Sequence, residues 1–358
     1  MKYKLDWPEA RERWTALWEG RRLDRPLICA TAPRETRCIP PKPRSGRQKY
    51  LDPDFNRRWF HAQLESTHFG GEAIPSFLLN GGWVASCYGA RPHFNLHTIW
   101  FESLPFDWDA PPAFDLDWKD VWFRRYETLH RAIVGLAGKD DFMVGQVCLL
   151  PASDVLALLL GGEQFLLALV ERPDWVRRTL RKLTENWCAI VGHFHLLTAA
   201  TNDFWYGNAG WARVWGPEPF VSTQSDISCM LSPEMFAEFI LPELDLVGQR
   251  FGRVWYHLDG PPAHRHLPAL CSREYLRVIQ WVPGAGQPPN GPAYLDLYRT
   301  IQRAGKILHI YVPMENIESI VRSLDPSRLI IETTVRSVRE ANELLAAARH
   351  WAGRQARV

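Results

Sequence analysis

The residues best suited to chemistry are a histidine and an aspartate at the end of one apolar run. The run rises through Val254 to His257 and Asp259 and then breaks at Gly260. Side chains two positions apart on a strand point to the same side, so we expect the imidazole and the carboxylate to share one face. Such a pair can bind a divalent metal or transfer protons. A histidine–aspartate pair that only holds the following loop is the alternative.

Other polar residues stand where further predicted strands end. Glu332 closes the last of these strands and is the third ligand we expect for a metal held by His257 and Asp259. Asp226, in a strand predicted at 225–231, is a further candidate catalytic residue. The candidates for substrate binding are Gln146, Tyr206, Gln280, Trp281, His309 and Tyr311. Each of these side chains could instead only satisfy a neighbouring loop or pack beneath it.

The elements that position these residues are alternating strands and helices, which are clearest in the last third of the chain. Short apolar strands followed by helices are typical of a parallel sheet covered by helices. Eight strands are predicted, at 74–79, 143–150, 204–206, 225–231, 253–259, 276–282, 307–312 and 329–334. Eight such units favour a closed (β/α)8 TIM barrel, in which the site lies at the carboxyl ends of the strands. An open doubly wound sheet is the alternative.

Residues 1–70 are predicted to be an N-terminal helical extension and loop, and residues 71–358 the barrel. The segment 33–54 is rich in Pro, Arg and Lys and reads as a mobile loop. A helix is expected to begin near Ser153 or Asp154, either of which suits the N-cap position.

Composition narrows the class of protein. The chain has 358 residues, 46% hydrophobic and 23% charged, with a net charge of +2, which is typical of a globular protein without a concentrated basic face for nucleic acid. No uncharged apolar run approaches the ~18 residues of a membrane span, and the N-terminus lacks the apolar core of a signal peptide. Seven dispersed cysteines without a C-x-x-C pair favour reduced thiols and a cytoplasmic location.

Several stretches resemble the uroporphyrinogen decarboxylase superfamily, whose members are (β/α)8 barrels, and most closely its corrinoid-linked methyltransferase-like branch. The stretches that carry the resemblance are Leu23–Pro26, Ser225–Phe236, Tyr256–Pro261, Ile279–Gly286 and Gly305–Lys306. Together they span nearly the whole chain. They are specific for the superfamily and not for one reaction.

The resemblance implies a metal site with altered ligands. In the zinc methyltransferases of that branch, a His-x-Cys on the fifth strand and a later Cys hold the metal. His257 matches the histidine, Asp259 stands where the first cysteine would be, and no cysteine follows Cys271. Glu332 lies where it could replace the second thiolate. Two carboxylates in place of thiolates would make the site harder, which argues against activation of a thiol. The arginine-rich N-terminal signature of the decarboxylase itself is not found, which argues against porphyrinogen decarboxylation.

The function expected from these observations is metal-assisted methyl transfer to or from a small molecule, with zinc as the metal, a corrinoid carried by a partner protein and, as in many superfamily members, a homodimer. One alternative is a lyase or decarboxylase of a small organic acid without corrinoid. In that enzyme His257 would donate a proton, and Arg213 or Arg336 would anchor the carboxylate. The other alternative is a non-catalytic ligand-binding barrel.

Overall fold

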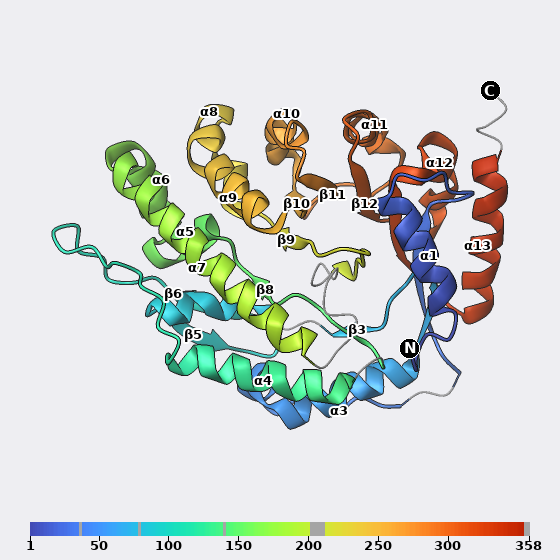
Figure 1. Ribbon diagram of the computed structural model, residues 1–358, viewed down its shortest axis with the longest axis horizontal. Coiled ribbons are helices and arrows are strands. Elements are labelled where there is room, and N and C mark those ends of the chain that lie inside the picture. The colour runs from blue at the N-terminus through green and yellow to red at the C-terminus, as the bar shows by residue number, and fades with distance from the viewer. Residues whose placement is uncertain (36–37, 78–79, 139–140, 201–211, 354–358) are drawn as a thin grey trace.

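A mostly parallel sheet of seven strands forms the centre of the molecule (Figure 1). The computed structural model describes residues 1–35, 38–77, 80–138, 141–200 and 212–353. The order of the strands is β2-β1-β13-β12-β11-β10-β9, and within it only β2 runs antiparallel to its neighbour. The strands are β1 (Leu27–Pro33), β2 (Thr67–Gly71), β9 (Val221–Thr223), β10 (Val254–Asp259), β11 (Leu276–Val282), β12 (Ile307–Tyr311) and β13 (Leu329–Thr334).

Shorter strands continue the arrangement beyond β9. They are the parallel pairs β3 (Ser76–Phe77) with β7 (Met143–Val144) and β4 (Asn80–Gly81) with β8 (Cys148–Leu149), and the antiparallel hairpin of β5 (Arg91–Phe94) with β6 (Ile99–Glu102). Gln146 joins the β7–β8 segment to β9: its Nε2 donates to the Ser222 carbonyl (3.0 Å) and its Oε1 accepts from the Ser222 amide (2.7 Å). A side-chain amide thus replaces a backbone ladder at this point.

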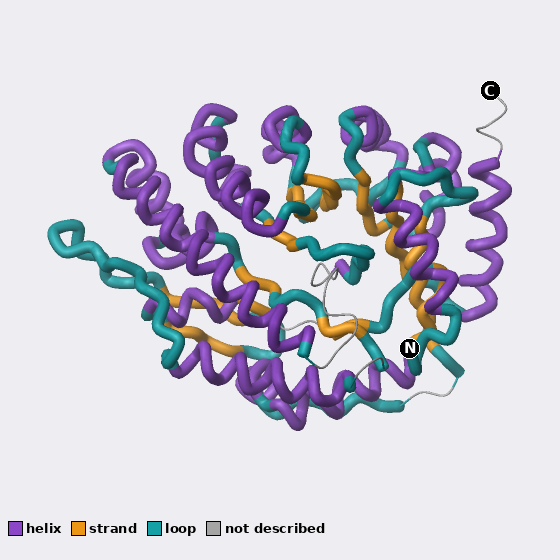
Figure 2. The backbone as a smooth tube through the Cα atoms, viewed as in Figure 1, coloured by secondary structure: helices purple, strands orange, loops and turns teal. Residues whose placement is uncertain are grey.

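Helices follow the strands around the outside of the sheet, as Figures 1 and 2 show. The α-helices are α1 (Trp7–Trp18), α2 (Gly46–Leu51), α3 (Pro53–Ser66), α4 (Val121–Ala137), α5 (Ala152–Leu160), α6 (Gly162–Glu171), α7 (Pro173–Ala199), α8 (Pro233–Met235), α9 (Leu241–Phe251), α10 (Leu267–Cys271), α11 (Leu295–Arg303), α12 (Met314–Ser323) and α13 (Val338–Gly353). Tighter 3-10 turns include Gly82–Tyr88, Asp226–Met230 and Pro261–His266, and Phe236–Ile240 is a π-helical turn between α8 and α9. The described residues therefore establish a mixed α/β fold. The closed eight-stranded barrel stays a prediction, since the backbone pairing of the described strands in the main sheet ends at β2 on one edge and at β9 on the other.

Local signals place the helix ends that frame the sheet. Ser232 accepts a hydrogen bond from the Met235 amide and Ser337 accepts one from Glu340, as expected for N-cap residues. Gly305 has a φ of +78°, the left-handed conformation that suits the residue after a helix. Each signal depends on neighbours in sequence, which is why it can be read without the fold.

Four expectations are corrected. The strand expected at 143–150 is two short strands, β7 and β8, separated by residues 145–147. The segment 225–231 is not a strand: the strand is β9 at 221–223, and Asp226–Met230 is a 3-10 turn. The segment 33–54 is not loop throughout, because it contains α2. The helix near Asp154 begins at Ala152, after Pro151, so neither Ser153 nor Asp154 is its N-cap. The strand expected at 204–206 lies outside the described residues.

Residues 1–70 share the core of the rest of the chain. They supply α1, β1 and most of β2, and β1 pairs in parallel with β13 from Leu27 opposite Ile330 to Thr31 opposite Thr334. Trp14 is fully buried in the same hydrophobic cluster as Ile331. The boundary expected at residue 70 therefore runs through the sheet, inside β2.

Among the described helices, none by itself is long and apolar enough to cross a membrane; α5 and α6 would reach that length only together, across a bend of 107°.

Candidate functional site

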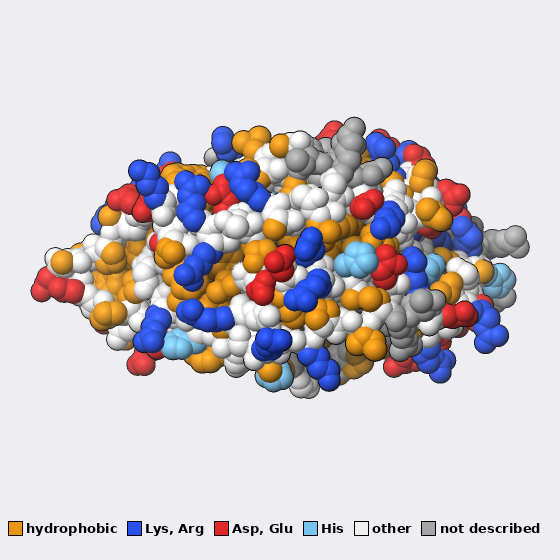
Figure 3. Space-filling model, turned by 90° about the horizontal axis from the view of Figure 1, so that it is seen from below, with side chains coloured by type: hydrophobic (Ala, Val, Ile, Leu, Met, Phe, Trp, Pro, Cys, Tyr) orange, Lys and Arg blue, Asp and Glu red, His pale blue; other side chains and the backbone are white. Residues whose placement is uncertain are grey.

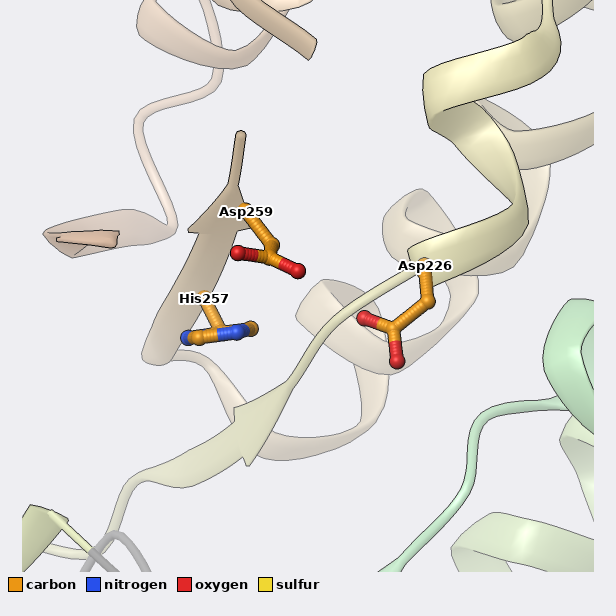
Figure 4. A group of neighbouring side chains, drawn as sticks. All are labelled: Asp226, His257 and Asp259. Carbon is orange, nitrogen blue, oxygen red and sulfur yellow. The ribbon is translucent and has the colours of Figure 1, made fainter. Parts of the chain in front are cut away.

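Three side chains that can bind a metal converge where β10 ends. They are His257 and Asp259 of β10 and Asp226, which follows β9 (Figure 4). One ligand atom from each lies within 4.8 Å of the others. Both aspartates are exposed and the histidine is half-buried, so the group is open to solvent. The expected alternation along β10 holds, because His257 and Asp259 do face the same side.

The hydrogen bond to His257 determines which ring nitrogen carries the proton. Its Nδ1 lies 2.6 Å from Oε1 of Gln280, the residue opposite it on β11. The amide oxygen can only accept, so Nδ1 donates and Nε2 holds a lone pair. Burial lowers the pKa of His257 and thereby favours this neutral form, although the bond to Gln280 and the charge of Asp259 oppose the shift. A neutral ring oriented through its other nitrogen is the usual state of a metal-binding histidine.

The two aspartates repel one another across the group. Protein atoms around Asp226 limit the hydration of its charge and raise its pKa, and the nearby Asp259 carboxylate raises it further. A divalent cation between the two carboxylates would remove this repulsion. One nitrogen and two carboxylate oxygens suit zinc and other borderline or hard divalent ions. The donor set therefore fits such an ion.

Asp154 of α5 holds Asp226 in place. Its buried carboxylate accepts hydrogen bonds from the backbone amides of Asp226 and Ile227, both at 3.0 Å. Beside it, the hydroxyls of Ser153 and Ser225 lie 3.1 Å apart. Burial and the neighbouring Asp226 raise the pKa of Asp154, while the two amides act in the opposite direction. The role of Asp154 was missed from the sequence, where its only signal was an aspartate at a helix start.

Glu332, the expected third ligand, is not part of this group in the described structure. Trp255 donates from Nε1 to Nδ1 of His309 (3.2 Å), so that nitrogen holds a lone pair. Nε2 of His309 then carries the proton and donates to Oε1 of Glu332 (3.0 Å). The structure therefore brings Asp226 to His257 and Asp259, and brings Glu332 to His309. The expected roles of His309 and Glu332 toward a ligand stay predictions.

Glu332 borders a separate small cavity at the ends of β1, β12 and β13. The cavity encloses about 220 Å³ and is lined by Cys29, Thr31, Ala73, Ile74, Arg213, Tyr311, Glu332, Thr333 and Thr334. Arg213 adopts a φ of +48°, which is uncommon for a residue other than glycine and is often found at binding sites. Arg336, the other candidate carboxylate anchor, pairs instead with Glu340 of α13 at 2.9 Å.

Of the remaining candidates, the two that the structure describes are buried in or beside the sheet. Trp281 lies on the side of β11 opposite to Gln280 and is fully buried against the rings of His264 and Tyr294, at 4.3 and 5.7 Å between centroids. It packs beneath the loop and does not face His257. Gln146 joins strands, as described above, and Tyr206 lies outside the described residues.

Comparison with known proteins gives a structural similarity and no match in sequence. No family model matches this chain, and no curated protein matches it in sequence. A methyltransferase from Methanosarcina mazei has a similar structure, with a TM-score of 0.61 over 95% of this chain and 98% of that chain, at 13% sequence identity. At that identity the similarity shows the fold alone: this chain has a methyltransferase-like fold.

Proposed function

We propose that this protein is a metal-assisted methyltransferase of the uroporphyrinogen decarboxylase superfamily, with a (β/α)8 barrel. The observation that carries the proposal is the convergence of His257, Asp259 and Asp226 at the ends of adjacent strands. The methyltransferase-like fold and the bridge from Gln146 to Ser222, which continues the sheet beyond β9, support it. A corrinoid on a partner protein is the proposed methyl carrier.

His257, Asp226 and Asp259 would hold a divalent metal, with zinc as the proposed ion. When bound, it would supply Lewis acidity toward a heteroatom of the methyl acceptor or donor. By accepting from Nδ1, Gln280 places the lone pair of the neutral His257 ring on Nε2. Asp154 sets the position of Asp226 through the backbone. The exposure of both ligand carboxylates leaves the group accessible to a substrate.

Metal binding tests this proposal directly. We expect the purified protein to bind Zn²⁺ with one-to-one stoichiometry in titration calorimetry. His257→Ala, Asp226→Asn and Asp259→Asn should each weaken binding by at least about tenfold, because each removes a ligand. Glu332→Gln is the matched control: it keeps an oxygen that can accept from His309 and should leave the affinity unchanged. If Glu332→Gln weakened binding as Asp226→Asn should, the ligand set would be wrong.

Methyl transfer needs its own assay. Methylcobalamin offered with a panel of thiol, amine and phenol acceptors should be demethylated by the zinc-loaded protein, with a change in the corrinoid absorption spectrum. The three ligand variants should lose this activity and Glu332→Gln should retain zinc. Full zinc binding without demethylation of any corrinoid, free or protein-bound, would contradict the methyltransferase proposal. The proposed metal site would still be supported by that result.

A lyase acting on a small organic acid is the second candidate, and the cavity with Arg213 is the observation that favours it. An arginine at the ends of the strands can anchor a carboxylate. Release of CO2 from a small acid without added corrinoid, lost in Arg213→Ala, would favour the lyase over the methyltransferase.

A further inference from the structure

A second, larger cavity lies on the face formed by α2, α3, α4 and the β5–β6 hairpin. It encloses about 600 Å³, within the usual range of small-molecule sites. Its lining is mostly apolar and shares no residue with the His257 group. The lining residues are Lys42, Pro43, Lys49, Tyr50, Phe55, Asn56, Trp59, Phe77, Leu96, Ile99, Tyr126 and Leu129. Figure 3 views the molecule from this side and shows hydrophobic side chains among Lys and Arg side chains.

The wall between α2 and the hairpin is closely packed. Gly46 begins α2 so near the hairpin turn that a Cβ atom there would lie 2.5 Å from the Asn95 carbonyl oxygen. Lys49 donates from Nζ to the Leu96 carbonyl at 2.6 Å, and the rings of Tyr50 and Phe94 lie 6.3 Å apart. The hairpin is therefore held against α2, and the hollow beneath them is part of the fold.

Two of the polar side chains that line the cavity are cationic, and none is anionic. Lys42 is exposed and Lys49 is half-buried, and within the described ranges neither forms an ion pair with a carboxylate. Nζ of Lys49 also lies 4.9 Å from the centre of the Tyr50 ring. Tyr126 adds a buried hydroxyl that has no hydrogen-bond partner among the residues that the structure describes. Buried polar groups are usually paired, so this hydroxyl keeps an unused capacity for a hydrogen bond.

The apolar side chains of the cavity reach the surface. Trp59 is 39% exposed and Leu96 is 46% exposed, although both border the cavity. Exposed apolar groups next to a concave apolar wall mark binding sites more often than chance would allow. Lys42 and Lys49 border the same cavity, and their positive charges favour a ligand with a negatively charged group.

We propose that this cavity binds an amphipathic monoanion, with an aliphatic or aromatic body inside and a carboxylate at Lys42 and Lys49. The apolar lining supplies affinity through burial of the body. The two lysines supply selection for the anion over a neutral molecule of the same shape. This proposal does not depend on the proposed methyltransferase function, and its test is separate.

Dodecanoate is the probe that tests the proposal, with dodecanol and dodecyltrimethylammonium of equal chain length as comparisons, all below their aggregation limits. We expect one dodecanoate per chain in titration calorimetry. The double variant Lys42→Ala/Lys49→Ala should weaken dodecanoate binding by about tenfold, since charge contacts within reach of solvent contribute modestly. Ile99→Trp should abolish binding by filling the cavity. Lys119→Ala, at an exposed lysine outside the lining, is the matched control and should change nothing.

Three results would overturn the proposal. Equal affinity for dodecanoate and dodecanol would remove the role of the lysines. Binding that survives Ile99→Trp, with circular dichroism showing a folded variant, would place the ligand elsewhere. A dimer in sedimentation that dissociates in Ile99→Trp would show that a second copy of the chain covers this face.

Discussion

At the scale of single residues, the surroundings of each histidine decide what its ring can do. His257 is oriented by Gln280 and lies half-buried beside two exposed carboxylates. His130 of α4 is buried, with Nε2 at 2.8 Å from the Thr198 hydroxyl, and no group among the described residues partners its Nδ1. The first ring is suited to binding a cation, and the second to a structural role in the core.

The buried His130 should make stability depend on pH. Burial, with the neighbouring His195 and His193, lowers its pKa to about 3, whereas the unfolded chain titrates near 6.5. The titration of His130 therefore leaves the free energy of unfolding unchanged above pH 6.5. As the pH falls from 6.5 toward 3, it lowers that free energy by about 1.4 kcal/mol per pH unit. In His130→Leu, the loss of unfolding free energy between pH 7 and pH 5 should shrink by about 2 kcal/mol.

Urea unfolding at the two pH values measures this difference. His97→Leu is the control, because His97 is exposed in the folded state and its replacement should leave the pH dependence unchanged. An unchanged pH dependence in His130→Leu would show that His130 is not kept neutral by the fold.

At the scale of elements, the start of α5 and the turn after β9 act as one unit. The Asp154 carboxylate binds two successive amides of the turn, and Ser153 meets Ser225. Glu243 of α9 accepts from the amides of Ala152 and Ser153, at 2.7 and 3.1 Å, and so holds the start of α5 in turn. The position of Asp226 thus depends on a chain of contacts from two helices.

We expect Asp154→Ala to weaken the metal site, although Asp154 is not one of its proposed ligands. Loss of its two hydrogen bonds should weaken zinc binding by about tenfold, the usual effect of a residue that orients a ligand. Asp154→Asn, which keeps one acceptor oxygen, should recover part of the affinity. Amide exchange should accelerate at Asp226 and Ile227 in Asp154→Ala, a readout that does not depend on metal.

Asp174→Ala serves as the comparison, since Asp174 is an exposed aspartate in the first turn of α7. Normal exchange at Asp226 together with unchanged zinc affinity in Asp154→Ala would refute the positioning role.

At the scale of the whole molecule, one buried carboxylate joins α1 and the segment before β1 to the sheet. Glu72 accepts from Arg25 through both oxygens, at 2.7 and 2.9 Å, from Arg13 of α1 at 2.8 Å and from the Ile28 amide of β1 at 2.8 Å. Arg25 belongs to Leu23–Pro26, one of the stretches that carry the family resemblance in the sequence. Its role in the structure is to hold the chain before β1.

Glu72→Ala should therefore be severely destabilising. It would leave the buried charge of Arg25 without a carboxylate, and breaking such a pair typically costs about 3–5 kcal/mol. We expect a large drop in the thermal midpoint, measured by circular dichroism or calorimetry. Glu12→Ala removes an exposed ion pair to Arg21 and should cost no more than about 1 kcal/mol. A Glu72→Ala protein as stable as Glu12→Ala would show that the N-terminal segment is not held by this contact.

Local patterns were sufficient for the later strands and for the pair on β10. Strands β11 and β13 have the predicted bounds, because apolar runs broken by Gly and Pro depend only on nearby residues. His257 and Asp259 share a face because alternation along a strand is also local. The segment around Asp226 was mistaken for a strand, since its apolar residues gave no sign of the turn that Asp154 imposes.

By itself, then, the sequence determined that a histidine and an aspartate would face one side at the end of a strand in an α/β protein. Only the tertiary structure decided which third carboxylate would join them. Glu332 is drawn to His309 by a hydrogen bond from a neighbouring strand, and Asp226 is turned toward His257 by a carboxylate from α5. Both choices depend on contacts between residues far apart in the chain, which no local pattern records.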